Sequence, residues 1–77
     1  MKKNEFLNAI EEILSIPKNT LLEDDILENF QDWDSIAFFE LSVFIDREFN
    51  LKIKPEDIKK FIYVRDILNS VGFNDNY

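Results

Sequence analysis

The chain of 77 residues contains no cysteine and no histidine, and it has one glycine and two prolines. The missing cysteines and histidines exclude disulfides, zinc sites built from these residues, and catalytic sets that use a thiolate or an imidazole. The single glycine, Gly72, excludes a glycine-rich phosphate-binding loop. We therefore expect no catalytic residue and no metal site, and the chain is not expected to be an enzyme.

Long apolar runs are also missing, because no stretch approaches the ~18 residues that a membrane span requires. Lys2 and Lys3 are not followed by an apolar segment, so we expect no signal peptide, and a cytoplasmic location. The length fits one domain over residues 1–77, expected to be a monomer. Its stability must come from apolar packing, for which eight phenylalanines and many isoleucines and leucines are available.

The formal charge of −7 is unevenly distributed. Residues 19–51 carry nine acidic side chains against one basic side chain, Arg47, which gives this segment a net charge of −8. Such a field repels nucleic acid and attracts basic protein partners, although an acidic surface kept only for solubility is an equal alternative. The stretch from Glu23 to Asp34 does not match a calcium-binding EF-hand loop, because it lacks the central glycine and the carboxylate spacing.

The apolar spacing predicts an all-α fold, a small four-helix bundle with a long connection after the first helix and a short third helix. The predicted helices are 3–16, 35–49, a short helix that begins at Pro55, and 64–71. Pro17 is expected to stop the first helix and Asn50 the second. Gly72 is expected just after the last helix, and residues 74–77 are expected to fray.

The connection over residues 18–33 is not featureless. Thr20 and Glu23 have the spacing of a capping box, which predicts a short helical turn there. Six apolar side chains are expected to pin the connection to the core: Leu21, Leu22, Ile26, Leu27, Phe30 and Trp33.

The predicted helix 35–49 is apolar on two sides at about 100° per residue. One stripe, expected to face the core, contains Phe38, Leu41, Ile45 and Phe49. The opposite stripe contains Ile36, Phe39 and Val43, beside Glu40 and Arg47. The second stripe is expected either to lie against the connection or third helix, or to stay exposed as a docking patch.

A motif lies where the acidic connection meets this helix. The sequence has Asp34-Ser35-Ile36, then Glu40-Leu41, then Ile45-Asp46-Arg47-Glu48-Phe49. This pattern resembles the Asp-Ser-Leu motif and second helix of acyl carrier proteins. The order and spacing of the other predicted helices are also similar, so the resemblance covers about residues 4–71.

The resemblance implies an acyl-carrier-like fold and a carrier rather than an enzyme. In that family a phosphopantetheinyl transferase moves 4′-phosphopantetheine from coenzyme A onto the motif serine, here Ser35. The arm then holds an acyl or aminoacyl group as a thioester, so a chain without cysteine can carry a thiol. Asp34 is expected to cap the helix and to help the modifying enzyme and its metal, and Ile36 adjoins the site. A helix N-terminus with free N–H groups would also favour the phosphate.

The expected docking residues are Glu40, Val43, Asp46 and Arg47, together with Ile36. The partners implied by the resemblance are the phosphopantetheinyl transferase, an acyl-loading ligase or synthase, and an acyl-receiving transferase. From a different class of function, the chain could be an unmodified acidic protein that inhibits a basic partner.

Four positions depart from the pattern of fatty-acid carriers: Trp33, Ile36, Ala37 and Arg47. The Trp-Asp-Ser form is more similar to dedicated carriers of polyketide, aminoacyl or surface-glycan pathways, with a general fatty-acid carrier as the alternative. Family carriers shelter acyl chains between the second and third helices. Bulky side chains are expected to line that space here and to favour a short or polar cargo: Phe38, Phe39, Phe44, Phe61 and Ile62.

Overall fold

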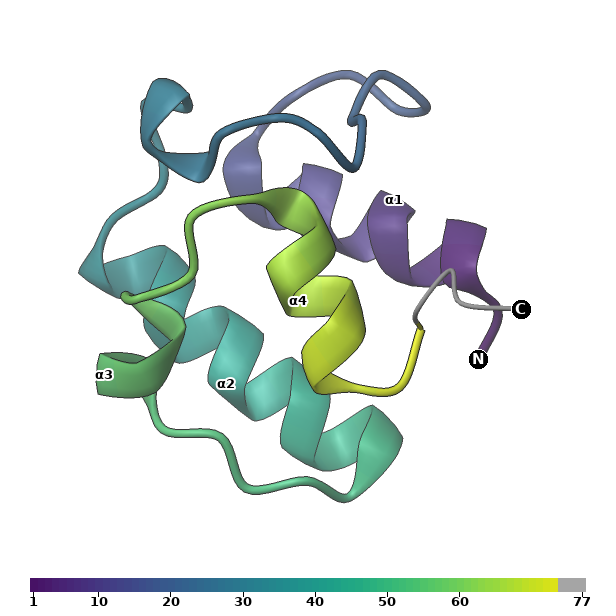
Figure 1. The fold of residues 1–77 in the computed structure, drawn as a ribbon, viewed down its shortest axis with the longest axis vertical. Coiled ribbons are helices and arrows are strands. Elements are labelled where there is room, and N and C mark those ends of the chain that lie inside the picture. Colours follow the sequence, from purple (N-terminus) through teal and green to yellow (C-terminus); the bar gives the residue numbers. More distant parts are fainter. Residues whose placement is uncertain (74–77) are drawn as a thin grey trace.

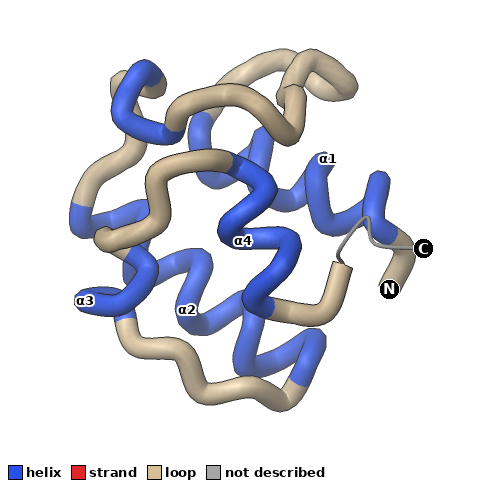
Figure 2. The backbone as a smooth tube through the Cα atoms, viewed as in Figure 1, coloured by secondary structure: helices blue, strands red, loops and turns tan. Residues whose placement is uncertain are grey.

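The computed structural model describes residues 1–73, whose regular structure consists of four α-helices and one 3-10 turn (Figure 1). The elements are α1 (Lys3–Leu14), the 3-10 turn η1 (Leu27–Asn29), α2 (Ser35–Phe49), α3 (Pro55–Ile58) and α4 (Val64–Ser70). Figure 2 shows helix and loop and no strand in this part of the chain. The predicted class, a small helical domain with four helices, is confirmed, whereas the predicted fraying of 74–77 lies outside the described residues.

The first helix ends earlier than predicted. α1 ends at Leu14 rather than at residue 16, because Ser15 adopts a left-handed conformation with φ 59° and ψ 42°. The Ile16 N–H then donates to the Glu11 carbonyl at 3.0 Å, which closes the helix end. Pro17 is therefore not the residue that stops α1.

The remaining helix ends follow local signals. Asn50 is left-handed at φ 57°, and its N–H donates to the Asp46 carbonyl at 2.9 Å, so the predicted stop of α2 is confirmed. Pro55 occupies the first turn of α3 as predicted. α4 ends at Ser70, one residue before the predicted end, and Gly72 follows with φ 99°. A glycine suits this position because it adopts a positive φ without steric cost.

The core is built from all four helices. α2 packs against both α1 and α3. The fully buried apolar side chains include Phe6, Ile10, Leu41, Ile45, Ile58, Val64, Ile67 and Leu68. The predicted core stripe of α2 is confirmed, since Leu41 and Ile45 are buried while Phe38 and Phe49 are half-buried against the core.

The long connection between α1 and α2 crosses the top of the view in Figure 1, and backbone hydrogen bonds attach it to the segment between α3 and α4. The Leu27 N–H donates to the Ile62 carbonyl at 2.9 Å, and the Val64 N–H donates to the Asp25 carbonyl at 3.0 Å. Beside these bonds, Ile26 and Tyr63 form an antiparallel bridge. The acidic connection is thereby fixed to the segment that enters α4.

Two predictions about this connection are wrong. Thr20 does not cap a helical turn with Glu23; its hydroxyl donates to the Pro17 carbonyl at 2.6 Å, and the helical turn occurs instead at Leu27–Asn29. Of the six predicted anchors, Leu22 and Ile26 are exposed. Leu21 and Leu27 are buried, and Phe30 and Trp33 are half-buried against the core.

Candidate functional site

Ser35 is the first residue of α2, and its side chain is exposed. Asp34 is the N-cap, with extended backbone angles of φ −140° and ψ −171°. One Asp34 carboxylate oxygen, Oδ1, accepts the N–H of Ile36 at 3.1 Å and the N–H of Ala37 at 3.2 Å. Within residues 1–73, no group hydrogen-bonds the Ser35 hydroxyl. The Ser35 side chain therefore projects into solvent from the capped first turn of α2.

The Asp34 cap corrects one expectation about this helix end. The first-turn N–H groups of Ile36 and Ala37 are not free, because the Asp34 carboxylate already accepts both. A phosphate attached to Ser35 would therefore meet a negative charge beside the helix N-terminus. The helix dipole would attract this phosphate less strongly than it would at a helix N-terminus without an acidic cap.

Trp33 fixes the approach of the connection to the serine. Its indole ring meets the ring of Phe38 edge-on, with 4.8 Å between ring centroids and 74° between ring planes. The backbone N–H of Trp33 donates to the Phe30 carbonyl at 3.1 Å. These contacts join the last turn of the connection to the first turn of α2, so the geometry around Ser35 is set from both sides.

The second apolar stripe of α2 is exposed. Ile36 is 68% exposed, Phe39 is 62% exposed and Val43 is 45% exposed. Of the two alternatives for this stripe, burial against the connection or α3 is thus excluded. An apolar stripe of this kind begins one residue after Ser35 and continues for two turns of α2, which is the form expected of a docking surface.

The charged docking residues predicted on α2 do not all lie together. The Asp46 carboxylate is turned to Lys52, whose Nζ lies 2.9 Å from Oδ2, beside the connection that precedes α3. Arg47 lies on the other side, where its guanidinium carbon is 5.5 Å from the Phe44 ring centroid. Glu40 and Val43 accompany Arg47, so Asp46 is separated from the other three.

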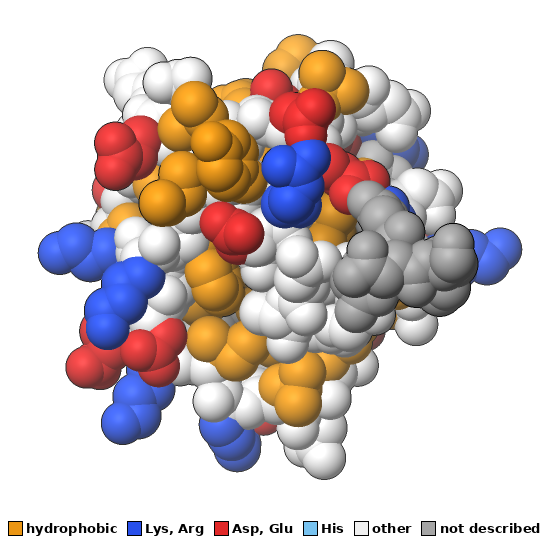
Figure 3. Space-filling model, in the orientation of Figure 1, with side chains coloured by type: hydrophobic (Ala, Val, Ile, Leu, Met, Phe, Trp, Pro, Cys, Tyr) orange, Lys and Arg blue, Asp and Glu red, His pale blue; other side chains and the backbone are white. Residues whose placement is uncertain are grey.

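The aromatic residues predicted to line one space between α2 and α3 are also divided. Phe44 faces α1, where its ring stacks on Phe6 with 5.7 Å between centroids. Phe39 is exposed, and Ile62 is 55% exposed. Figure 3 shows apolar side chains gathered beside the connection between α3 and α4, the region where Ile62 and Tyr63 are exposed. The prediction that these side chains together line one space between α2 and α3 is therefore wrong.

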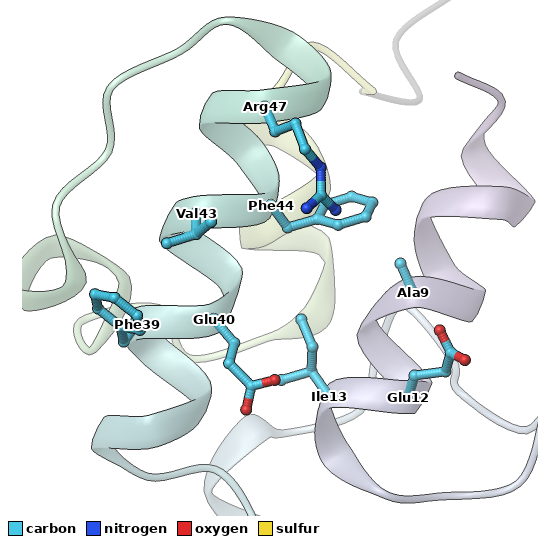
Figure 4. Close-up of a pocket in the computed structure, with 8 residues that line it drawn as sticks. All are labelled: Ala9, Glu12, Ile13, Phe39, Glu40, Val43, Phe44 and Arg47. Atoms are coloured by element: carbon cyan, nitrogen blue, oxygen red, sulfur yellow. The ribbon is translucent and has the colours of Figure 1, made fainter.

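A groove that the sequence did not predict lies between α1 and α2. It has a volume of about 380 Å³. Figure 4 shows its side chains, which come from both helices. The lining residues are Ala9, Glu12, Ile13, Phe39, Glu40, Val43, Phe44 and Arg47. The spacing of Ala9, Glu12 and Ile13 places them on one face of α1, but spacing does not reveal which face meets α2.

Residues 1–73 contain no group of three acidic side chains arranged to hold a metal ion. The described helices are each too short or too polar to traverse a bilayer. Comparisons of the chain with protein-family models, curated proteins and solved structures gave no match.

Proposed function

We propose that this chain is an acyl carrier protein, with Ser35 as the attachment point of 4′-phosphopantetheine. The observation that supports this most directly is the exposed Ser35 hydroxyl, which lacks a hydrogen-bond partner in the described chain and stands at the capped start of α2. The exposed stripe of Ile36, Phe39 and Val43 begins beside it. A reactive group and a partner surface on one rigid helix are what a carrier requires, and the proposed fold is the acyl-carrier-like bundle.

The modification is a phosphoryl-type transfer onto the serine oxygen. The Ser35 oxygen forms a bond to the phosphorus that carries pantetheine, the phosphoanhydride bond of coenzyme A breaks, and adenosine 3′,5′-bisphosphate leaves. A base of the phosphopantetheinyl transferase takes the hydroxyl proton, because no described residue hydrogen-bonds it. Asp34 keeps α2 intact through its cap and presents a carboxylate oxygen to the transferase and its metal.

When bound, the arm supplies the terminal thiol that holds an acyl or aminoacyl group as a thioester. The chain itself contributes a fixed attachment point and a surface that partner enzymes recognise. An acyl-loading ligase or synthase and an acyl-receiving transferase are the proposed partners. We place the carrier in a dedicated biosynthetic pathway, because Arg47 and Trp33 give its surface features that fatty-acid carriers usually lack.

Intact-mass measurement tests the proposal. The wild-type protein, incubated with coenzyme A and a broad-specificity phosphopantetheinyl transferase, should gain the mass of one phosphopantetheine. Ser35→Ala should gain nothing and keep its fold, whereas Ser42→Ala, a control on the same helix, should still be modified. Wild-type protein that takes up no group would instead favour an unmodified acidic interaction protein.

A further inference from the structure

The groove between α1 and α2 has an apolar floor. Ile13 of α1 and Phe44 of α2 are half-buried and face it. Val43 also lines the groove, although much of its side chain stays exposed. The exposed stripe that begins at Ile36 reaches the groove through Phe39 and Val43. An apolar partner residue could therefore contact the stripe and the groove at once.

The two ends of the groove carry opposite charges (Figure 4). Glu12 of α1 and Glu40 of α2 stand at one end, and neither forms an ion pair with another described residue. Arg47 stands at the other end, over the ring of Phe44, and its Nε also lies 3.3 Å from the Glu48 carboxylate in a pair open to solvent. This polarity selects a partner with a cation at the first end and a carboxylate at the second.

The spacing of these charges defines the shape of the partner. Glu40 and Arg47 are separated by seven positions of α2, which is about 10 Å along a helix axis. A second helix that lies along the groove matches this span with charged residues at i and i+7 and apolar residues at i+3 and i+4.

We propose that the groove seats an amphipathic helix of a client enzyme, with a basic side chain at the Glu12–Glu40 end and an acidic side chain at the Arg47 end. This assignment rests on the proposed carrier function for the identity of the client. It adds α1 to the docking surface. Partners are then distinguished by Glu12 of α1 together with Glu40 of α2, rather than by α2 alone.

The experiment uses two synthetic helical peptides and the unmodified protein labelled with ¹⁵N. The first peptide has Lys at i, Leu at i+3 and i+4, and Glu at i+7, and the second has Lys at both i and i+7. Amide shifts should appear at Ala9 and Ile13 as well as along α2. Glu40→Lys should weaken binding of both peptides about fivefold, as expected for loss of one rim charge pair, whereas Glu56→Lys should not.

Arg47→Glu is the decisive variant, because it should shift the affinity ratio about fivefold toward the peptide with two lysines. Lys60→Glu changes the net charge equally on the α3 side and should leave that ratio unchanged. Equal shifts in both variants, no binding at millimolar peptide, or amide shifts confined to α2 and α3 would overturn the proposal. Because the protein is unmodified, these results are separate from the intact-mass test of the carrier function.

Discussion

The Glu11 carboxylate accepts the backbone N–H of Leu21 at 2.9 Å, which ties the start of the long connection to the buried side of α1. The same carboxylate accepts the N–H of Asn19 at 3.0 Å and the N–H of Thr20 at 2.9 Å. Glu11 is only 2% exposed and is the buried charged residue of the described core. One side chain therefore satisfies three consecutive amides of a loop. These hydrogen bonds stabilise the fold only while the carboxylate is present and ionised.

Glu11→Gln should destabilise the protein by about 2–3 kcal/mol, because an amide has one acceptor oxygen and its NH₂ group would face the loop amides. For a domain of this size, the melting temperature should fall by roughly 10–20 °C. Glu12→Gln, at the exposed neighbouring position, should change stability by less than about 0.5 kcal/mol. Thermal denaturation followed by circular dichroism measures both, and equal melting temperatures would show that the carboxylate is not an anchor.

The same carboxyl predicts how stability responds to acid. Burial acts to raise the pKa of Glu11, but the N–H groups of Leu21, Asn19 and Thr20, with Lys18, outweigh it and lower the pKa below 4.5. A lowered pKa in the folded state means that the stabilisation is present above pH 4.5 and is lost as the pH falls through the folded value. The melting temperature of Glu11→Gln should therefore depend less on pH below 4.5 than that of the wild type.

Replacing Asp34 separates its structural role from its proposed role in modification. Asp34→Ala should cost about 1 kcal/mol of stability, since the N–H groups of Ile36 and Ala37 lose their acceptor. Asp34→Asn keeps an acceptor oxygen and should retain most of that stability. If the charge also serves the transferase, Asp34→Asn should take up phosphopantetheine much more slowly than the wild type, even though it keeps most of its stability. Intact mass measured over time gives the two rates. An Asn variant modified at the wild-type rate would limit Asp34 to capping.

Val43→Asp tests whether the exposed stripe is a docking surface. Val43 is 45% exposed, so the change should alter stability by less than about 1 kcal/mol. Transfer of the acyl group to a cognate enzyme should slow markedly, because the charge enters an apolar contact. Leu41→Ala, in the core of the same helix, should instead cost about 2–5 kcal/mol. A folded Val43→Asp that supports transfer at the wild-type rate would place docking elsewhere.

A short acyl group should stabilise the carrier at least as much as a long one. The ring of Phe6 already contacts the rings of Phe44 and Phe49 between α1 and α2, and Trp33 packs edge-on against Phe38. A long chain would have to displace packed rings, which costs contact energy. Melting temperatures of the two-carbon and ten-carbon thioester forms provide the comparison. A clearly higher value for the ten-carbon form would contradict this packing argument.

The features that the sequence predicted best are those with local signals. The bounds of α2 follow from the Asp34 side chain before it and the Asn50 stop after it, and the core positions Leu41 and Ile45 follow from helical period. The motif serine is placed at the first turn of α2 for the same reason.

The features that were missed depend on where distant segments meet. Glu11 can accept the loop amides only because the chain turns back over α1 after the helix ends. From the spacing alone, Glu11 is simply an acidic residue on a helix. The α1–α2 groove depends on which faces of two helices meet. Leu22 was expected inside because it is apolar, but the turn that its N–H makes with the Asp25 carboxylate leaves its side chain outside.

The backbone bonds that join the acidic connection to the entrance of α4 also order events during synthesis. The Leu27 N–H needs the Ile62 carbonyl, and the Val64 N–H must exist before the Asp25 carbonyl can accept it. A ribosome-bound chain that stops short of this segment cannot close the connection, because these contacts are distant in sequence. The connection that leads to Ser35 can therefore close only after residues 62–64 have been synthesised, so the folded surroundings of this serine depend on a segment almost 30 residues further along the chain.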